Sequence, residues 1–170
     1  MVRHLDMEER APLVGGLHIA EALESEVEEI DRIQREAFRT PWSSDLIRGA
    51  VLNPRYDVRT LTNGMGRVLG FYIAHGDHHA SNLDNLAVDA PERSLGLGSR
   101  LLMDWVSASQ AANRMRLTLQ VNTDNRRAQK LYERFDFRAV KLLVSYYPNG
   151  DDAYQMELIK GSPPQGFRLP

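Results

Sequence analysis

The sequence has 170 residues, and none of them is cysteine. This absence excludes disulfide bonds, metal sites built on thiolates and covalent intermediates on cysteine, and it suits a reducing compartment. No apolar run approaches the ~20 residues that cross a bilayer. Residues 1–16 carry charged side chains where a signal peptide has an apolar core. We therefore expect a cytoplasmic protein that does not bind a membrane.

The sequence also has no large excess of charge of either sign, since it contains 21 basic and 23 acidic residues and its net charge is -2. We therefore expect no direct nucleic-acid partner. A balanced total still allows charge to gather locally. A run of basic residues is usually a solvated helix face, although it could also bind an acidic cofactor. One such run consists of Arg126, Arg127, Lys130, Arg134, Arg138 and Lys141.

The chain length fits a single domain that buries about 70% of the surface exposed by its unfolded chain. We expect an N-terminal extension at 1–16, one folded domain at 17–160 and a C-terminal tail at 161–170. Both a monomer and a homodimer are compatible with the sequence.

Hydrophobic periodicity predicts alternating strands and helices in the first half of the chain. The hydroxyl of Ser25 would cap the first helix. The segment Asn63-Gly64-Met65-Gly66 indicates a hairpin, because such a turn needs positive φ. The expected elements are a strand at Leu17–Ala20, a helix from about Ser25, a loop at Phe38–Ser43, a short helix ending before Asn53, and a meander of strands at Tyr56–Leu61, Arg67–His75 and Asn82–Val88.

The second half of the chain continues the alternation. Asp124 can cap a helix whose apolar stripe includes Tyr132. Asp136 stands at the exit of that helix, where a left-handed conformation is usual and where Asp is tolerated better than most residues. The expected elements are a helix ending at about Ala112, a strand at Met115–Val121, the helix after Asp124, and strands at Phe137–Tyr147 and Ala153–Ile159.

An apolar strand ending at Val88 runs through a short turn into a helix whose first turn contains Gly96 and Gly98. The first amides of a helix have no intrahelical partner, and the helix dipole adds about half a positive charge, so this turn can hold a phosphate through its backbone. A dinucleotide fingerprint does not fit, because Leu101 stands where a third glycine is needed. No Gly-Lys-Ser/Thr follows for a triphosphate loop either.

Two motifs in this order carry a family resemblance: Arg93-x-x-Gly96-x-Gly98, and Asn125-x-x-Ala128-x-x-Leu131-Tyr132-Glu133. Together with the meander they resemble the GNAT acetyltransferases, which move an acetyl group from acetyl-CoA to an amine. The resemblance covers about Leu17–Ile159. It implies a single α+β (mixed α/β) domain with a mixed, mostly antiparallel central sheet of about seven strands flanked by helices.

Within the family, three segments resemble the ribosomal-protein alanine N-acetyltransferases, the RimI-like branch that acetylates protein N-termini: Pro41-Trp42-Ser43, Asn85-Leu86-Ala87-Val88-Asp89, and Tyr146-Tyr147-Pro148 followed by Asp152-Ala153. The implied acceptor is the N-terminal α-amine of a peptide or protein. At pH 7 roughly one such amine in seven is neutral, against a few in ten thousand for lysine, so an α-amine needs less help to react.

The resemblance implies acetyl-CoA as the cosubstrate. The backbone amides of Leu95, Gly96, Leu97, Gly98 and Ser99, here called the cradle, would hold its pyrophosphate. The strand before the cradle would bind the pantetheine arm like an added strand, and Asn125 would hydrogen-bond the arm. Arg93, Arg100 or the face at 126–130 could meet the ribose phosphate. The implied cofactor-binding residues are Leu86, Ala87, Val88, Arg93, Ser94, Leu95, Gly96, Leu97, Gly98, Ser99, Asn125 and Tyr132.

Tyr132 is the implied general acid, which would protonate the departing thiolate. Its place on an apolar stripe also fits an ordinary core tyrosine. RimI-like enzymes carry a glutamate as base where this chain has Gln120, and an amide cannot accept the proton of an ammonium group. The base candidates are Asp84, which strand alternation places on the same face as Leu86 and Val88, one of His75, His78 and His79, or a chain of water molecules.

The implied acceptor-binding residues are Arg39, Trp42, Gln120, Tyr146 and Tyr147. We expect no metal, because the histidines near His75 alternate across a strand and turn without a fourth ligand. The leading hypothesis is direct transfer, with backbone donors near Val88 stabilising the oxyanion. The alternatives are an acyl-CoA-binding module that has lost catalysis, motivated by Gln120, and acetylation of a small-molecule amine, since the fold is widely reused.

Overall fold

The structure is a computed structural model that describes residues 16–159. Apart from residue 16, the expected extension at 1–16 and tail at 161–170 lie outside the described residues. The elements are β1 (His18–Glu21), η1 (Glu24–Glu26), α1 (Val27–Ala37), α2 (Ser44–Leu52), β2 (Tyr56–Thr62), β3 (Val68–Gly76), β4 (Ala80–Val88), η2 (Ala90–Glu92), α3 (Leu97–Ala111), β5 (Arg116–Asn122), α4 (Arg126–Glu133), β6 (Arg138–Leu143) and β7 (Ala153–Ile159).

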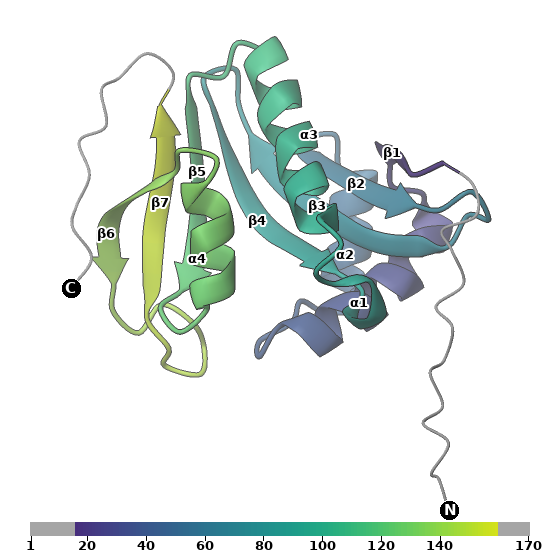
Figure 1. The fold of residues 1–170 in the computed structure, drawn as a ribbon, viewed down its shortest axis with the longest axis horizontal. Coiled ribbons are helices and arrows are strands. Elements are labelled where there is room, and N and C mark those ends of the chain that lie inside the picture. Colours follow the sequence, from purple (N-terminus) through teal and green to yellow (C-terminus); the bar gives the residue numbers. More distant parts are fainter. Residues whose placement is uncertain (1–15, 160–170) are drawn as a thin grey trace, which may run out of the picture.

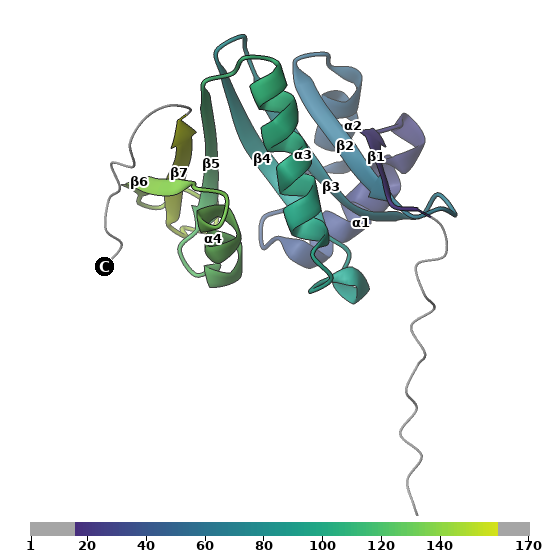
Figure 2. The same ribbon diagram turned by 45° about the horizontal axis from the view of Figure 1, so that its top comes forward.

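The strands form one seven-stranded sheet in the order β1-β2-β3-β4-β5-β7-β6 (Figure 1). Every neighbouring pair is antiparallel except β4 and β5, which run parallel. Helices α3 and α4 cover one face of the sheet, and α1 and α2 cover the other (Figure 2). The predicted α+β domain with a mixed, mostly antiparallel sheet is confirmed. Within residues 16–159, no helix combines the length and the apolar character that crossing a membrane requires.

Each face of the sheet has its own apolar core. On the α1 face, Val27, Ile30 and Ile33 follow one helical stripe and are fully buried against β2 and β3. On the α3 face, Trp105 is fully buried and stacks on Phe137 with ring centroids 5.8 Å apart. Burying one such side chain contributes roughly 1.5–3 kcal/mol, so the two cores fix both layers of helices to the sheet.

Two predicted helix caps are wrong. Ser25 lies inside the 3-10 turn η1, where the backbone N–H of Leu23 instead donates to Glu26 Oε2 at 2.8 Å. At the start of α4, Asn125 is the cap: its Oδ1 accepts from the N–H of Ala128 at 3.1 Å. Asp124 stands one residue too early for that contact, because a capping side chain reaches only the second or third amide of the helix.

The penultimate strand is shorter than predicted, because β6 ends at Leu143 and the chain turns at Ser145, which has a φ of 50°. Tyr146 and Tyr147 therefore lie in the β6–β7 loop and are not part of a strand. The hairpin between β2 and β3 is as predicted, and Gly66 provides its positive φ of 78°.

A β-bulge in β4 decides the direction of Asp84. In the ladder with β3, Leu83 pairs with Ala74 and Asn85 pairs with Ile73, which leaves Asp84 between them without a partner. A bulge residue interrupts the alternation of faces. The side chain of Asp84 consequently contacts His75, on the α1 face. The predicted placement of Asp84 with Leu86 and Val88 is therefore wrong, since those two pack against the α3 core.

The sheet opens between β4 and β5. Their parallel pairing covers only Ala80–Leu83 against Arg116–Leu119. Beyond it, β4 stays paired with β3 as far as Val88, and β5 stays paired with β7 as far as Asn122. The two strands diverge toward their C-terminal ends, as Figure 1 shows. Each strand thus keeps a stretch of edge without a neighbour.

Asp136 occupies the left-handed position after α4, with a φ of 66°. Its ion pair with Arg138 spans 3.6 Å at the surface and contributes little. We expect Asp136→Gly to raise the melting temperature by about 2 °C, because glycine adopts this conformation without a clash involving Cβ. Differential scanning calorimetry tests this, with Asp136→Ala as the matched variant that should melt below the parent. Equal melting of the two variants would contradict the expectation.

Candidate active site

The opening between β4 and β5 is part of a cleft with a volume of about 700 Å³. The α1–α2 loop, β4, β5, α4 and the β6–β7 loop each contribute to its lining. The cleft brings together these predicted site residues: Arg39, Trp42, Asp84, Leu86, Gln120, Asn125, Tyr132, Tyr146 and Tyr147.

The edge of β4 that faces the cleft has free backbone groups at Leu86, together with the free N–H of Val88. Bonded and non-bonded pairs alternate along an antiparallel ladder. The N–H of Asp89 bonds Leu69 O at 2.8 Å, so the groups of Leu86 and Val88 point away from β3. The side chain of Arg93 accordingly reaches Val88 O from the open side, at 3.0 Å from its Nε. This edge can pair with an extended ligand that carries amides.

The turn after β4 forms the predicted cradle at the start of α3. Ser94 and Gly96 both adopt positive φ, at 71° and 80°, which bends the backbone around the helix end. The carbonyl of the cap residue Gly96 accepts from the N–H of Arg100 at 3.1 Å. The amides before Arg100 are therefore the ones without an intrahelical acceptor, so they are free to bind an anion.

Basic groups near the cradle differ in what they reach. Arg127 extends from α4 to Ser94 Oγ at 3.3 Å, so its charge lies beside the cradle. Arg100 points away and donates to Leu17 O at 3.3 Å. Nη2 of Arg93 is buried and has no partner among the described residues. A free strand edge, free helix amides and a neighbouring cation suit an amide-bearing arm joined to a diphosphate, which is the chemistry of coenzyme A.

Tyr132 lies where α4 meets the cleft. Only 8% of the residue is exposed, and its ring packs edge-on against Phe137 with centroids 6.2 Å apart. Burial, and to a lesser degree Tyr147, raises the pKa of Tyr132 well above that of a free phenol. Its hydroxyl therefore stays protonated at neutral pH and is available as a donor into the cleft.

The α1–α2 loop, which borders the cleft, is held by a residue that sequence reasoning missed. Gln34 of α1 is fully buried, and its side chain bonds both backbone groups of Trp42, accepting from the N–H at 3.1 Å. The Trp42 ring meets Tyr56 edge-on at 6.4 Å. The sequence signal that could have identified Gln34 is its position beside the apolar stripe of α1. Gln129 on α4 was missed in the same way: it is 3% exposed and donates to Asn122 O and Thr123 O.

Arg39 links the two loops that border the cleft. It pairs with Asp151 of the β6–β7 loop at 3.0 Å and approaches Asp124 at 3.7 Å. Asp151 also accepts from Asn149 and Asn122, and these hydrogen bonds together with Arg39 lower its pKa. In the same loop, the rings of the predicted contacts Tyr146 and Tyr147 stand nearly perpendicular with centroids 5.0 Å apart.

A hydrogen-bonded row crosses β5, β4 and β3 on the α1 face. Gln120 Nε2 donates to Asn82 Oδ1 at 3.2 Å, and Asn82 Nδ2 donates to Asp84 Oδ1 at 2.9 Å. The other carboxylate oxygen of Asp84 lies 2.6 Å from His75 Nδ1. Burial raises the pKa of Asp84, and His75 and Asn82 only partly offset this.

The other two histidines considered as bases lie elsewhere. His78 and His79 pack against each other in the β3–β4 turn with centroids 5.9 Å apart, and they do not line the cleft. Among residues 16–159, no group of three or more His, Cys, Asp or Glu side chains is placed to hold a metal ion.

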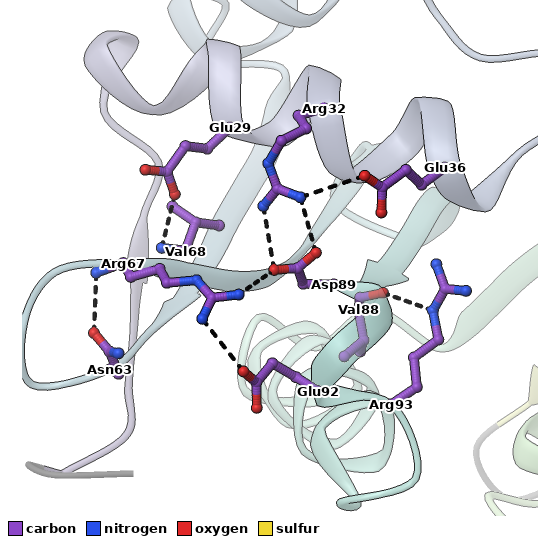
Figure 3. A network of polar contacts seen from close by, with 10 residues as sticks. All are labelled: Glu29, Arg32, Glu36, Asn63, Arg67, Val68, Val88, Asp89, Glu92 and Arg93. Atoms are coloured by element: carbon purple, nitrogen blue, oxygen red, sulfur yellow. Dashed lines mark hydrogen bonds and ion pairs between the residues drawn. The ribbon is translucent and has the colours of Figure 1, made fainter. Parts of the chain in front are cut away.

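Asp89, the first residue after β4, fixes the turn that leads to the cradle through its side-chain contacts (Figure 3). This carboxylate is 1% exposed and accepts from Arg32 of α1 at 2.9 Å and from Arg67 of the β2–β3 hairpin at 2.5 Å. Burial alone would raise the pKa of Asp89, but the two guanidinium groups outweigh it and hold the pKa below its ordinary value. Arg67 also contacts Glu92 at 3.4 Å. Three separate segments are thus joined at the start of the cradle.

Comparison with known proteins agrees with this geometry. The family model for the acetyltransferase (GNAT) domain matches residues 56–139. An uncharacterised N-acetyltransferase of Methanocaldococcus jannaschii is 33% identical over 134 residues, which cover 77% of this chain and 84% of that protein. A ribosomal-protein alanine N-acetyltransferase of Haemophilus ducreyi is 28% identical over 141 residues, covering 81% and 93%.

Among solved structures, a ribosomal-protein alanine N-acetyltransferase from Escherichia coli superposes with a TM-score of 0.79 at 25% identity. The match covers 91% of this chain and all of that protein, so it extends over both halves of the open sheet. The chain therefore belongs to the GNAT family of acetyl-CoA-dependent N-acetyltransferases.

Proposed function

We propose that this protein acetylates the N-terminal α-amine of a peptide or protein by direct transfer from acetyl-CoA. The observation that carries the proposal is the open β4 edge, which leads from the cradle at α3 to a cleft with aromatic and acidic side chains at its far end. Relatives named for acetylation of ribosomal-protein alanine support the peptide acceptor.

Acetyl-CoA supplies the acetyl group as an activated thioester. The cradle amides and Arg127 bind the diphosphate, and the backbone groups of Leu86 with the N–H of Val88 pair with the arm. Asn125 can still donate its Nδ2, because only its Oδ1 is used in capping α4. These groups position the cosubstrate, because together they hold its thioester in the opening between β4 and β5.

Tyr132 assists the departure of sulfur. A thiol has a pKa of about 8.5, so a phenol with a raised pKa does not lose its proton completely to a thiolate. The Tyr132 hydroxyl therefore keeps its proton and donates a hydrogen bond to the sulfur as negative charge develops there, and the proton that neutralises the sulfur comes from the reacting nitrogen. This arrangement leaves no covalent acetyl-enzyme, and the chain has no cysteine to form one on a thiol.

A mixed-substrate assay tests the acceptor class. The purified protein receives acetyl-CoA together with peptides of varied N-terminal residues, the same peptides with blocked N-termini, and a set of polyamines. We expect mass spectrometry to find acetyl groups on free peptide N-termini, with at least a tenfold preference over polyamines and lysine side chains, because the α-amine has the lower pKa. Acetylation of polyamines alone would replace the proposal with small-molecule transfer.

A binding measurement separates catalysis from mere cofactor binding. If calorimetry detects tight binding of coenzyme A while no peptide or polyamine is acetylated, the chain is an acyl-CoA-binding module. The proposed location is the cytoplasm, because a chain without cysteine suits a reducing compartment.

A further inference from the structure

The cleft contains three carboxylates among its described lining residues: Asp84, Asp124 and Asp151. Asp151 is engaged by Arg39 and two asparagine amides. Asp124 also lies near Arg39, with 74% of its side chain exposed. Asp84 differs from both, because its side chain is 15% exposed and no arginine or lysine pairs with it among the described residues. It is therefore the carboxylate of the cleft that is least stabilised in its charged form.

The bulge in β4 gives Asp84 its access to the acceptor side. Without it, the side chain would lie with Leu86 and Val88 in the α3 core. With it, Asp84 shares the α1 face with Gln120, the two being linked through Asn82. Gln120 cannot take a proton, but its Oε1 has no recorded partner among the described residues and can accept a hydrogen bond from an amine.

We propose that Asp84 accepts the proton of the acceptor ammonium group, and that His75 positions its carboxylate. The inference rests on the proposed function and names the base for the same reaction. His75 Nδ1 lies 2.6 Å from Asp84 Oδ2. Because a carboxylate only accepts, the shared proton belongs to Nδ1 when both groups are in their neutral-pH forms. Oδ1 keeps a lone pair beyond its bond from Asn82, and this lone pair receives the proton.

The bonds and protons balance as follows. The ammonium proton moves to Asp84, which frees the nitrogen lone pair to form a bond with the acetyl carbon as the carbon–sulfur bond breaks. The nitrogen loses a second proton when the amide forms, and that proton neutralises the sulfur as a thiol. The proton on Asp84 leaves through the open cleft to water, so one proton is released per turnover and the carboxylate is restored.

The groups around the pair come from β2, from the β6–β7 loop and from β4 itself. On β2, the ring of Tyr56 lies 5.6 Å from that of His75. On the β6–β7 loop, burial and the negative charge of Asp84 raise the pKa of Tyr146. On β4 itself, Asn82 is uncharged and donates to Asp84. His75 is thus the one cation-forming side chain recorded in contact with Asp84 in residues 16–159, and its effect is to lower the pKa of that carboxyl.

The pH dependence of kcat/KM with a free N-terminal peptide tests the assignment. The parent can use the abundant ammonium form and should give a level profile above the pKa of Asp84. An Asp84→Asn variant can react only with the neutral fraction of the amine, which is about one in seven at pH 7 and about one in sixty at pH 6. Its kcat/KM should therefore be about sevenfold below the parent at pH 7 and about sixtyfold below at pH 6. A ratio that stays constant with pH would overturn the inference.

A second variant tests the positioning role of His75. His75→Gln retains a hydrogen-bond donor but removes the side chain that lowers the pKa of Asp84, so the acid limb of its profile should move to higher pH. Carbon-detected NMR of the free protein gives an independent readout, since the Asp84 carboxyl should titrate above the usual range in the parent and higher still in His75→Gln. An Asp84 carboxyl that titrates identically in both proteins would contradict the role.

Matched controls separate the two levels of the proposal. Asp45→Asn and His78→Gln alter exposed groups outside the cleft and should keep the parent profile. Calorimetric binding of coenzyme A should be unchanged in Asp84→Asn. If the parent acetylates peptides while Asp84→Asn follows the parent at every pH, Asp84 is not the base and the proposed function stands. If the parent acetylates no peptide, the proposed function fails and Asp84 has no acceptor proton to take.

Discussion

Tyr132→Phe should lower kcat by about a hundredfold with the best peptide substrate, the lower end of the range for removing one hydrogen-bond donor to charge that develops in the transition state. The substitution removes one hydroxyl from the cleft and leaves the ring packed against Phe137, so the fold should persist. The loss should fall on kcat, since the donor acts on charge that develops as the sulfur departs. Release of free thiol, followed with a colorimetric reagent, measures the rate.

Tyr154→Phe is the matched control for removing a buried tyrosine hydroxyl. Tyr154 lies on β7, is 7% exposed and belongs to the same apolar core as Tyr132, but it does not line the cleft. Its kcat should stay within twofold of the parent. A Tyr132→Phe rate within about twofold of the parent would show that Tyr132 is a core residue, which is the alternative that its apolar stripe suggests.

Asp89→Asn should lower the free energy of unfolding by about 3 kcal/mol, because it removes the buried partner of two guanidinium groups. The loss in the free energy of unfolding should not be larger, because Glu36 and Glu92 lie close to the same arginines and both arginines are almost half exposed to water. For a chain of this length the melting temperature should fall by roughly 6–12 °C. Thermal unfolding followed by circular dichroism at pH 7 measures the change.

The loss should depend on pH. Since the folded-state pKa of Asp89 lies below the unfolded value of about 3.9, its contribution is fully present above pH 5. The contribution disappears as the pH falls through the lower folded-state value. Parent and variant should therefore converge in stability as the pH falls below the ordinary carboxyl range. Asp45→Asn, with a side chain that is 97% exposed, should change stability by less than about 0.5 kcal/mol at pH 7. An equal loss in both variants would contradict the role of Asp89.

The sequence predicted those parts of the fold that depend on local chemistry. Gly66 in the hairpin and Asp136 after α4 both adopt the positive φ expected of them. The cradle helix begins after Gly96, and its apolar residues Leu101, Leu102 and Trp105 stand at helical spacing and are buried. These features depend on conformational preference and apolar spacing within one segment, which a single sequence contains.

Features that depend on tertiary pairing were not predictable in the same way. The bulge that turns Asp84 toward His75 arises from the register between two strands, and alternation within β4 alone gives the opposite face. The helix caps failed because Ser25 and Asp124 are good capping residues by type, yet the chain enters each helix one or two positions later. Gln34 is polar in sequence but is buried because Trp42 gives it two backbone partners.

The short parallel contact between β4 and β5 makes the free protein an incomplete sheet whose two halves are joined by four residue pairs. A ligand that pairs with the open β4 edge would supply the missing interactions, and any molecule that binds only the folded state stabilises it, by about 2.7 kcal/mol at a hundred times its dissociation constant. The lifetime of this enzyme in a cell is therefore linked to the metabolic supply of its own acyl donor.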